Sequence, residues 1–190
     1  IQLNTEISVS AVKAALNEHS RVKAVILVSP TYDGVVSDIR AIAGEVHRRG
    51  IPLIVDEAHG AHFGFHPYFP ESALKQGADV VICTGGMSVD PDDRTPGAIK
   101  ATGTRIVSYG APVLPGAMML VSYYEKDGRQ IPILGLPGCV MYAKNTIFDL
   151  LLPRLMADDE ITLSEINQLG EGGLCLNCDV CTFPNCGFGK

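Results

Sequence analysis

The sequence lacks a hydrophobic run approaching the roughly 18 to 20 residues that span a bilayer, so we expect no membrane-spanning segment and no membrane partner. It also lacks a block of like charge, because 15 Lys and Arg residues are interspersed with 21 Asp and Glu residues, for a net charge of −6. We therefore expect no nucleic-acid partner. The sequence shows neither an initiator Met nor a signal peptide, so we expect either that the chain begins within a gene or that it is an engineered piece.

The composition is that of an ordinary globular protein. Hydrophobic residues make up 46% and charged residues 19% of the 190 residues, which excludes a disordered, collagen-like or coiled-coil chain. At about 150 residues per domain, this length corresponds to about one domain. A chain of this size can bury a core without disulfide bonds.

Alternating strand and helix patterns predict an α/β fold. Short apolar runs rich in β-branched residues indicate buried strands at residues 24–29, 52–56, 79–84, 105–108, 118–123 and 131–134. Four helices are predicted between and after these strands. The first is capped by Ser37 and ends at Gly50, and the second begins at Thr95-Pro96. The third covers 140–156, where Pro153 should end or kink it, and the last begins with a capping box at Thr162 and Glu165. We expect three layers, with a mostly parallel sheet, helices on both faces and a short Cys-rich C-terminal tail.

The first candidate site follows the second predicted strand. Asp56 ends this strand, where a carboxylate can hold the protonated ring nitrogen of pyridoxal phosphate. The motifs SPTYDG, VDEAHGAHFGFHP and GADVVI resemble the large domain of the ornithine/lysine/arginine decarboxylases over about residues 10 to 82. These are pyridoxal-phosphate enzymes of the aspartate-aminotransferase fold. The resemblance implies that Asp56 and His59 belong to a cofactor-binding site.

The resemblance stops before the catalytic lysine of that family. There the strand after GADVV leads into a Ser-x-His-Lys turn whose lysine forms the Schiff base, whereas this strand continues into CTGGM. The nearest downstream lysine, Lys100, falls in a predicted helix. Without an imine-forming lysine we expect neither covalently held pyridoxal phosphate nor decarboxylation. The alternative function is a decarboxylase remnant that binds basic amino acids or the cofactor without chemistry.

Two other interpretations apply to the same loop. DEAH is also a helicase motif, but the G-x-x-x-x-G-K-[ST] phosphate loop that accompanies it is absent from the sequence. His59, His62 and His66 have the chemistry to ligate a metal together with Asp56 or Glu57, on the basis of ligand type alone.

The second candidate site begins where the third predicted strand ends. Gly85 and Gly86 let a backbone approach a ligand closely, and Ser88 adds a hydroxyl. Asp90, Asp92 and Asp93 add carboxylates that suit Mg²⁺. The helix at Thr95 offers backbone N–H groups to an anion, and the turn at 135–138, leading into the long helix, offers a second such terminus. This pattern suits a phosphorylated ligand carried with a divalent metal.

This segment is similar to the molybdopterin-binding domain of molybdopterin-adenylylating and molybdenum-insertion proteins. The motifs are TGGMSVDPDD, the Pro115-Gly116 turn and GLPGCVMYAKNTIFDLLLP. The resemblance implies a catalytic acidic residue at Asp93 and cofactor-binding loops at Thr84, Gly85, Gly86, Ser88, Pro137 and Gly138. Asp90, where insertion-type proteins usually have Gly, is expected to share Mg²⁺ with Asp93. Cys139 replaces a small polar residue.

The resemblance implies binding of molybdopterin or its nucleotide form in molybdenum-cofactor biosynthesis or handling. The sequence does not decide between binding alone and an Mg²⁺-dependent adenylyl- or molybdenum-transferase activity. The partners that such a function implies are a molybdoenzyme, another cofactor-assembly protein or a second copy of the chain. The chain is interpreted as a mosaic joined near residues 79–84. We expect a decarboxylase-like segment at 1–78, a molybdopterin-binding-like segment at 79–170 that completes the same sheet, and a tail at 171–190.

Four of the six cysteines crowd into the tail. Its sequence, GGLCLNCDVCTFPNCGFGK, has the spacing C-x2-C-x2-C-x4-C and suits either Zn²⁺ or an iron–sulfur cluster. The candidate metal ligands are Cys175, Cys178, Cys181 and Cys186. Such clustering indicates thiolate ligation in a reducing compartment, so we expect a cytoplasmic protein; reduced surface thiols are the alternative. Cys83 and Cys139 are expected to be small buried hydrophobes.

Overall fold

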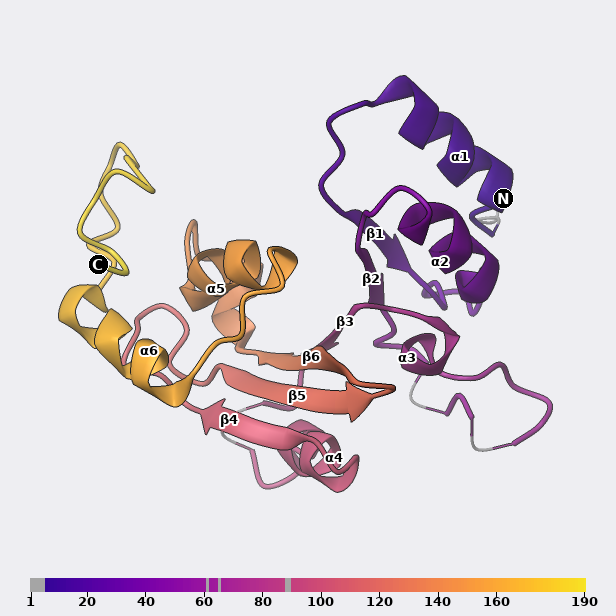
Figure 1. Cartoon of the computed structure of the whole chain (residues 1–190). Coiled ribbons are helices and arrows are strands. Elements are labelled where there is room, and N and C mark those ends of the chain that lie inside the picture. Colours follow the sequence, from indigo (N-terminus) through magenta and orange to yellow (C-terminus); the bar gives the residue numbers. More distant parts are fainter. Residues whose placement is uncertain (1–5, 61, 65, 88–89) are drawn as a thin grey trace. The chain divides into compact units, whose positions relative to one another are not determined.

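The computed structural model describes residues 6–60, 62–64, 66–87 and 90–190 (Figure 1). Two compact units make up the chain, Ile1–Cys83 and Thr84–Lys190, termed here the N-terminal unit and the C-terminal unit. Both contain helices and strands, so the expected α/β class is confirmed. Within the described ranges, no helix is both long enough and apolar enough to cross a membrane.

Three parallel strands form the sheet of the N-terminal unit. These are β1 (Val25–Val28), β2 (Leu53–Asp56) and β3 (Val80–Thr84), with β2 in the middle. Val25 pairs with Leu53, and Ile54 pairs with Val80. Each strand lies within the run that predicted it, and the parallel pairing expected for these three runs is confirmed.

Helices α1 (Val9–Glu18), α2 (Ile39–His47) and α3 (Ala73–Gln76) supply the rest of the core of this unit. The buried cluster consists of Val12, Leu16, Leu27, Ile39, Ile42, Ala43, Val46, Leu53, Val55, Ala73 and Ala78. In α2 the apolar residues recur at helical spacing and Ile42 and Val46 are fully buried, because that face packs inward.

The cap of α2 is Asp38 and not the expected Ser37. The Asp38 carboxylate accepts the N–H of Ala41 at 2.9 Å. Ser37 serves other partners, because its hydroxyl accepts the N–H of Ile7 and its own N–H donates to the Ser29 hydroxyl. Ser37 therefore joins the start of the chain to the turn after β1.

Three antiparallel strands form the sheet of the C-terminal unit, β4 (Arg105–Tyr109), β5 (Leu120–Lys126) and β6 (Arg129–Leu136), with β5 in the middle (Figure 1). The strands lie where the sequence predicts them, but their direction of pairing differs from the expected one. Asp127 and Gly128, both at positive φ, join β5 directly to β6. A two-residue turn permits only an antiparallel pair, since parallel strands need a crossover of a dozen or more residues.

Five described helical segments accompany these strands: α4 (Thr95–Ala101), the 3₁₀ turn η1 (Gly138–Met141), α5 (Ile147–Met156), α6 (Leu163–Gln168) and the 3₁₀ turn η2 (Leu169–Gly172). The predicted capping box of α6 is confirmed. The long helix expected over 140–156 is wrong at its start, because Thr146 and Asp149 form a second capping box and α5 begins there. Pro153 lies inside α5, which continues to Met156.

Candidate functional site

A glycine turn follows β3 and is fastened to the first residue of α4. Gly85 and Gly86 both have positive φ, at +77° and +62°. The Thr95 hydroxyl donates to the Gly85 carbonyl at 2.8 Å, and the Thr95 N–H donates to the Gly86 carbonyl at 3.2 Å. A Cβ at Gly86 would lie 2.8 Å from the Thr95 Oγ1, so this position requires glycine on two counts. Thr84, Gly85 and Gly86 are all exposed.

The start of α4 offers an anion fewer donors than the sequence predicts. The helix is seven residues long, and Pro96 in its first turn has no N–H. The Thr95 N–H is already used by the glycine turn. An anion at this loop would therefore bind mainly to backbone N–H groups of the glycine turn and not to the start of α4.

The acidic residues that follow form a closed turn. The Asp93 N–H donates to the Asp90 carbonyl at 2.9 Å, and the Asp90 N–H donates to an Asp93 carboxylate oxygen at 3.3 Å. Asp92 is exposed. Across residues 6–60, 62–64, 66–87 and 90–190, no three His, Cys, Asp or Glu side chains are gathered closely enough to hold a metal ion. Ser88 lies outside the described residues.

Met87 connects this first loop to the strand that leads into the second loop. A Cβ placed on Gly135 would collide with the Met87 side chain, whose Sδ would lie 2.6 Å from it. The Tyr109 hydroxyl donates to the Met87 carbonyl at 2.5 Å. Met87 is 3% exposed, so it is packed in the core of the unit. The glycine turn and the turn at Pro137 are thus parts of one packed assembly, a connection that sequence reasoning missed.

The second loop lines a cavity of about 570 Å³. Pro137 and Gly138, both predicted from the sequence, take part in its lining. The remaining lining residues are 114–118, Cys139, Tyr142, Leu174 and Cys175. The expected α-helix N-terminus at this turn is replaced by the short 3₁₀ turn η1. None of residues 84–87 and 90–95, the described part of the first loop, lines this cavity.

The Pro115-Gly116 turn of the second motif forms another wall of the same cavity and fixes the start of α5. The Ile147 N–H donates to the Pro115 carbonyl at 3.1 Å. Gly116 has a φ of +126°, and a Cβ there would lie 3.0 Å from the Ile147 Cβ. Only glycine satisfies both the backbone conformation and the close approach.

The lining of this cavity is mostly apolar. Aliphatic and ring carbons dominate it, and its polar groups are backbone amides, two thiols and the hydroxyl of Tyr142. No Lys or Arg is among the described residues that line the cavity, so its lining provides no side-chain cation for a phosphate group. Lys144, the cation nearest in sequence, lines the neighbouring cavity.

The four tail cysteines all line this neighbouring cavity, which has a volume of about 410 Å³. Cys175 is fixed there by backbone pairing with Leu114, whose carbonyl accepts the Cys175 N–H at 2.8 Å. Pro115, Tyr142, Leu174 and Cys175 line both cavities. All six cysteines of the chain are free thiols.

Asn145 is a tail partner that the sequence did not reveal. Its side-chain N–H donates to the Cys181 sulfur at 3.1 Å. The pKa of the Cys181 thiol is lowered, first by the backbone N–H of Phe183 and then by Asn145, with Lys144 adding its charge. Burial acts in the opposite direction on Cys139 and raises its pKa.

In the N-terminal unit, Asp56 and His59 lie where β2 ends. One Asp56 carboxylate oxygen accepts the N–H of Ala58 at 3.0 Å. The His59 ring meets Tyr32 edge to face, with ring centres 5.5 Å apart. His62 makes ring contacts with Phe63 and Phe69, and His66 accepts the N–H of Tyr68. The interpretation of these histidines as a metal cluster finds no gathered ligands within the described residues.

Glu57 is the strongly perturbed carboxyl group of this unit. Burial raises its pKa to about 7, against the lowering effect of the Ala73 N–H that it accepts at 2.7 Å. Burial also raises the pKa of Cys83 to about 11, with smaller effects from the charges of Glu57 and Asp56. The three lysines of the unit, Lys13, Lys23 and Lys75, lie before β3, and none follows it at the position of an imine-forming lysine.

Two family models match the chain over adjacent segments that overlap at residues 69–89. Residues 2–89 match the major domain of Orn/Lys/Arg decarboxylases, and residues 69–157 match a probable molybdopterin binding domain. The N-terminal segment is 46% identical over 78 residues to the uncharacterized protein YaaO of Bacillus subtilis. It is also 45% identical over 74 residues to an arginine decarboxylase of Bacillus cereus.

These sequence matches are partial. They cover 41% and 39% of this chain and only 16% of each of the two relatives. Among solved structures, the tungsten cofactor synthesizing protein MoaB from Pyrococcus furiosus can be superposed on this chain. The superposition covers 71% of this chain and 92% of the MoaB chain. Its sequence identity is 19% and its TM-score is 0.39, too weak a likeness to support an argument. The predicted resemblance of the N-terminal part to the decarboxylases and of the C-terminal part to the molybdopterin-binding domains is confirmed by the two family matches.

Proposed function

We propose that the C-terminal unit binds molybdopterin or its nucleotide form and serves molybdenum-cofactor biosynthesis or handling. The observation that carries the proposal is the cavity lined by Pro137-Gly138 and Pro115-Gly116, two motifs within the residues that match the molybdopterin-binding family. The motifs are separate in sequence, yet they form walls of one cavity whose lining is mostly apolar.

The ligand would lie with its ring in this cavity and its phosphate directed to the glycine turn. Both glycines of the turn have exposed backbone, and Thr95 holds their carbonyls away from an incoming anion. Asp93 and Asp90 would hold Mg²⁺ beside that phosphate, since carboxylate oxygens are the ligands that Mg²⁺ prefers. Mg²⁺ would supply charge neutralisation, and Asp93 would position it. Adenylyl transfer, metal insertion and simple carriage of the ligand all use this arrangement.

Filling the cavity tests the proposal. A Cβ at Gly138 meets nothing within 4 Å, so Gly138→Leu should fold normally and occupy the space intended for the ring. Gly44 in α2 has equally open surroundings and provides the matched control, Gly44→Leu. Titration calorimetry with molybdopterin under anaerobic conditions should show binding by the unmodified chain and Gly44→Leu. Gly138→Leu should bind at least about tenfold more weakly, a loss of about 1.4 kcal/mol.

Asp93→Asn tests the phosphate end separately. The asparagine keeps an oxygen to accept the Asp90 N–H but loses the charge that attracts Mg²⁺. Its affinity for the ligand should fall in the presence of Mg²⁺ and match the unmodified chain in its absence. Equal binding by the unmodified chain, Gly138→Leu and Asp93→Asn would remove the assignment.

The compartment and partners belong to the same proposal. Six free thiols are compatible with a reducing, cytoplasmic setting. A protein that binds the pterin for delivery would meet a molybdoenzyme or another cofactor-assembly protein. Co-purification of the intact chain in a molybdenum-using host, with and without Gly138→Leu, tests whether that contact depends on the loaded cavity.

A further inference from the structure

The tail is a loop whose two ends are joined by a hydrogen bond. All four of its cysteines lie between those ends in the sequence and line the cavity. The Gly189 N–H donates to the Gly172 carbonyl at 2.8 Å, which joins the two ends of the tail. Phe188, next to this contact, is 5% exposed and packed into the unit. Because the loop is already closed, bringing its sulfurs together does not incur the entropy of closing a free chain end.

Turns separate the four cysteines, and among the described residues no three of their sulfurs are gathered closely enough to hold a metal ion, so a metal site here requires the loop to tighten. Asn177 has a positive φ of 47°, and the Asn185 N–H donates to the Thr182 carbonyl at 2.7 Å in a tight turn. Cys178 and Cys181 are exposed, while Cys175 and Cys186 are partly buried. The two exposed cysteines therefore lie on the solvent side of the loop, and forming the site would bring them toward the two that are partly buried.

The lining of the cavity also includes groups that complement negative charge. Lys144 lines it, and Asn145 directs an N–H to the Cys181 sulfur. Four thiolates around one divalent ion carry a net charge of about −2, which a nearby ammonium and amide donor stabilise. Thr146, the next residue, caps α5, so these two groups are presented from a rigid helix start.

We propose that Cys175, Cys178, Cys181 and Cys186 form a four-thiolate site for a soft metal centre, closed by tightening of the tail loop and supported by Asn145. Zn²⁺ and an iron–sulfur cluster share this chemistry. Binding of Zn²⁺ would replace the thiol protons and release them to solvent. The metal site does not depend on the proposed pterin binding, although Cys175 places it at the wall that the two cavities share.

The test uses the full chain and metal alone. The protein is purified without oxygen and its bound zinc, iron and sulfide are measured. The metal-free chain is then titrated with Co²⁺ as a coloured substitute for Zn²⁺, and separately treated with sulfide and a mixture of ferrous and ferric iron, which supplies the oxidation state of a cluster. We expect one centre per chain. Tetrahedral cobalt–thiolate absorption with bound zinc identifies a zinc site, and matched iron and sulfide with brown colour identify a cluster.

The variants separate ligands from support. Cys178→Ser and Cys181→Ser change exposed side chains, so folding should survive, and each should weaken metal binding by more than about 100-fold. Asn145→Ala should weaken it by about 10- to 100-fold, and Cys83→Ala should leave it unchanged. The proposal is overturned if neither metal treatment gives a stoichiometric centre, or if both serine variants bind as tightly as the unmodified chain. If the unmodified chain failed to bind the pterin but still bound the metal, the proposed function would be contradicted and the metal-site proposal would stand.

Discussion

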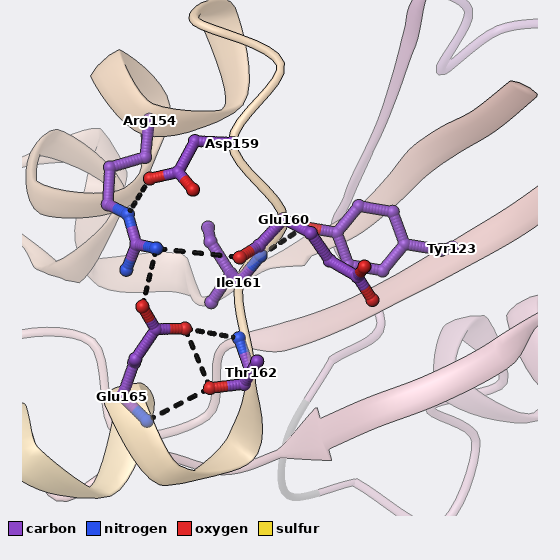
Figure 2. A network of polar contacts seen from close by, with 7 residues as sticks. All are labelled: Tyr123, Arg154, Asp159, Glu160, Ile161, Thr162 and Glu165. Atoms are coloured by element: carbon purple, nitrogen blue, oxygen red, sulfur yellow. Dashed lines mark hydrogen bonds and ion pairs between the residues drawn. The ribbon is translucent and has the colours of Figure 1, made fainter.

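Arg154 in α5 and Glu165 in α6 form an ion pair, with the Arg154 Nη2 and the Glu165 Oε1 2.7 Å apart (Figure 2). The same guanidinium donates to Asp159 at 2.7 Å, and the Glu165 carboxylate also accepts the Thr162 N–H and hydroxyl. At the other end of the network, the Ile161 N–H donates to the buried Tyr123 hydroxyl of β5 at 2.8 Å. The connection from α5 to α6 is thereby tied to the sheet.

This network predicts loss of stability in acid. The Thr162 hydroxyl and N–H, followed by Arg154, lower the pKa of Glu165 to about 2 from 4.5. A lowered pKa contributes stability that is fully present above the unfolded-state value and is lost as the pH falls through the folded-state value. The chain should therefore lose stability between pH 4.5 and about 2, and Glu165→Gln should show a shallower decline. Urea unfolding followed by circular dichroism measures this, since the sequence has no Trp. An unchanged slope in the variant would contradict it.

The raised pKa of Glu57 predicts that the N-terminal unit loses stability as the pH rises. Its pKa is raised to about 7 from 4.5, so the folded unit binds a proton that the unfolded chain releases across this range. Stability should fall as the pH rises from 4.5 to 7. The side chain is only partly buried, so solvent reduces the effect below what the shift alone implies. Glu57→Gln keeps an acceptor for the Ala73 N–H and should flatten the slope, whereas the exposed Glu18→Gln should not. Equal slopes in all three proteins would count against the buried carboxyl.

The Pro115-Gly116 turn predicts a large cost for a single methyl group. Gly116→Ala adds left-handed strain of about 1–2 kcal/mol and overpacking against Ile147 of about 1–3 kcal/mol. Gly128→Ala is the matched control, because its φ of +76° is also positive but nothing lies within 4 Å of the added Cβ. It should cost only the strain of about 1–2 kcal/mol. If both variants lost the same free energy of unfolding in chemical denaturation, Ile147 would be moving aside for the added methyl group without an energetic penalty, which would contradict the prediction.

Strand positions could be predicted from the sequence because both runs are apolar and β-branched: VILV became β1 and LIVD became β2. The expected burial holds for β2, where Leu53, Ile54 and Val55 are buried, but not for β1, where Ile26 and Val28 are exposed. The pairing direction of the later strands was missed although Asp127-Gly128 is a common hairpin turn. The start of α5 was missed because an apolar helical pattern runs through Thr146 and Asp149, whose reciprocal hydrogen bonds begin the helix at Ile147.

The candidate site was only half predictable for a physical reason. Local spacing identifies a glycine turn or a cysteine array, because each depends on a few neighbouring residues. Contacts between Met87 and Gly135, or a wall shared by Tyr142 and Cys175, depend on distant segments meeting in space. No periodicity in one segment encodes them.

Incubation with pyridoxal phosphate tests the N-terminal unit. The decarboxylase resemblance assigns Asp56 to the ring nitrogen, but no lysine of this unit follows β3, so we expect no imine formed at a strand end. Borohydride reduction and peptide mass spectrometry should find at most scattered surface lysine adducts. Substitution Asp56→Asn should not change their pattern. A single stoichiometric adduct that depends on Asp56 would restore the decarboxylase-remnant interpretation.

Met87 and Gly135 predict coupled effects on stability. Met87→Ala removes a side chain that is 3% exposed and should cost about 2–5 kcal/mol, whereas Met141→Ala, at an 82% exposed position, should cost less than about 0.5 kcal/mol. Gly135→Ala forces a methyl group against the Met87 side chain and should cost about 1–3 kcal/mol. In the double variant the new methyl group enters the space that Met87 leaves. The combined loss should therefore fall short of the sum by at least about 0.5 kcal/mol, whereas strict additivity would show that the two loops are not packed together.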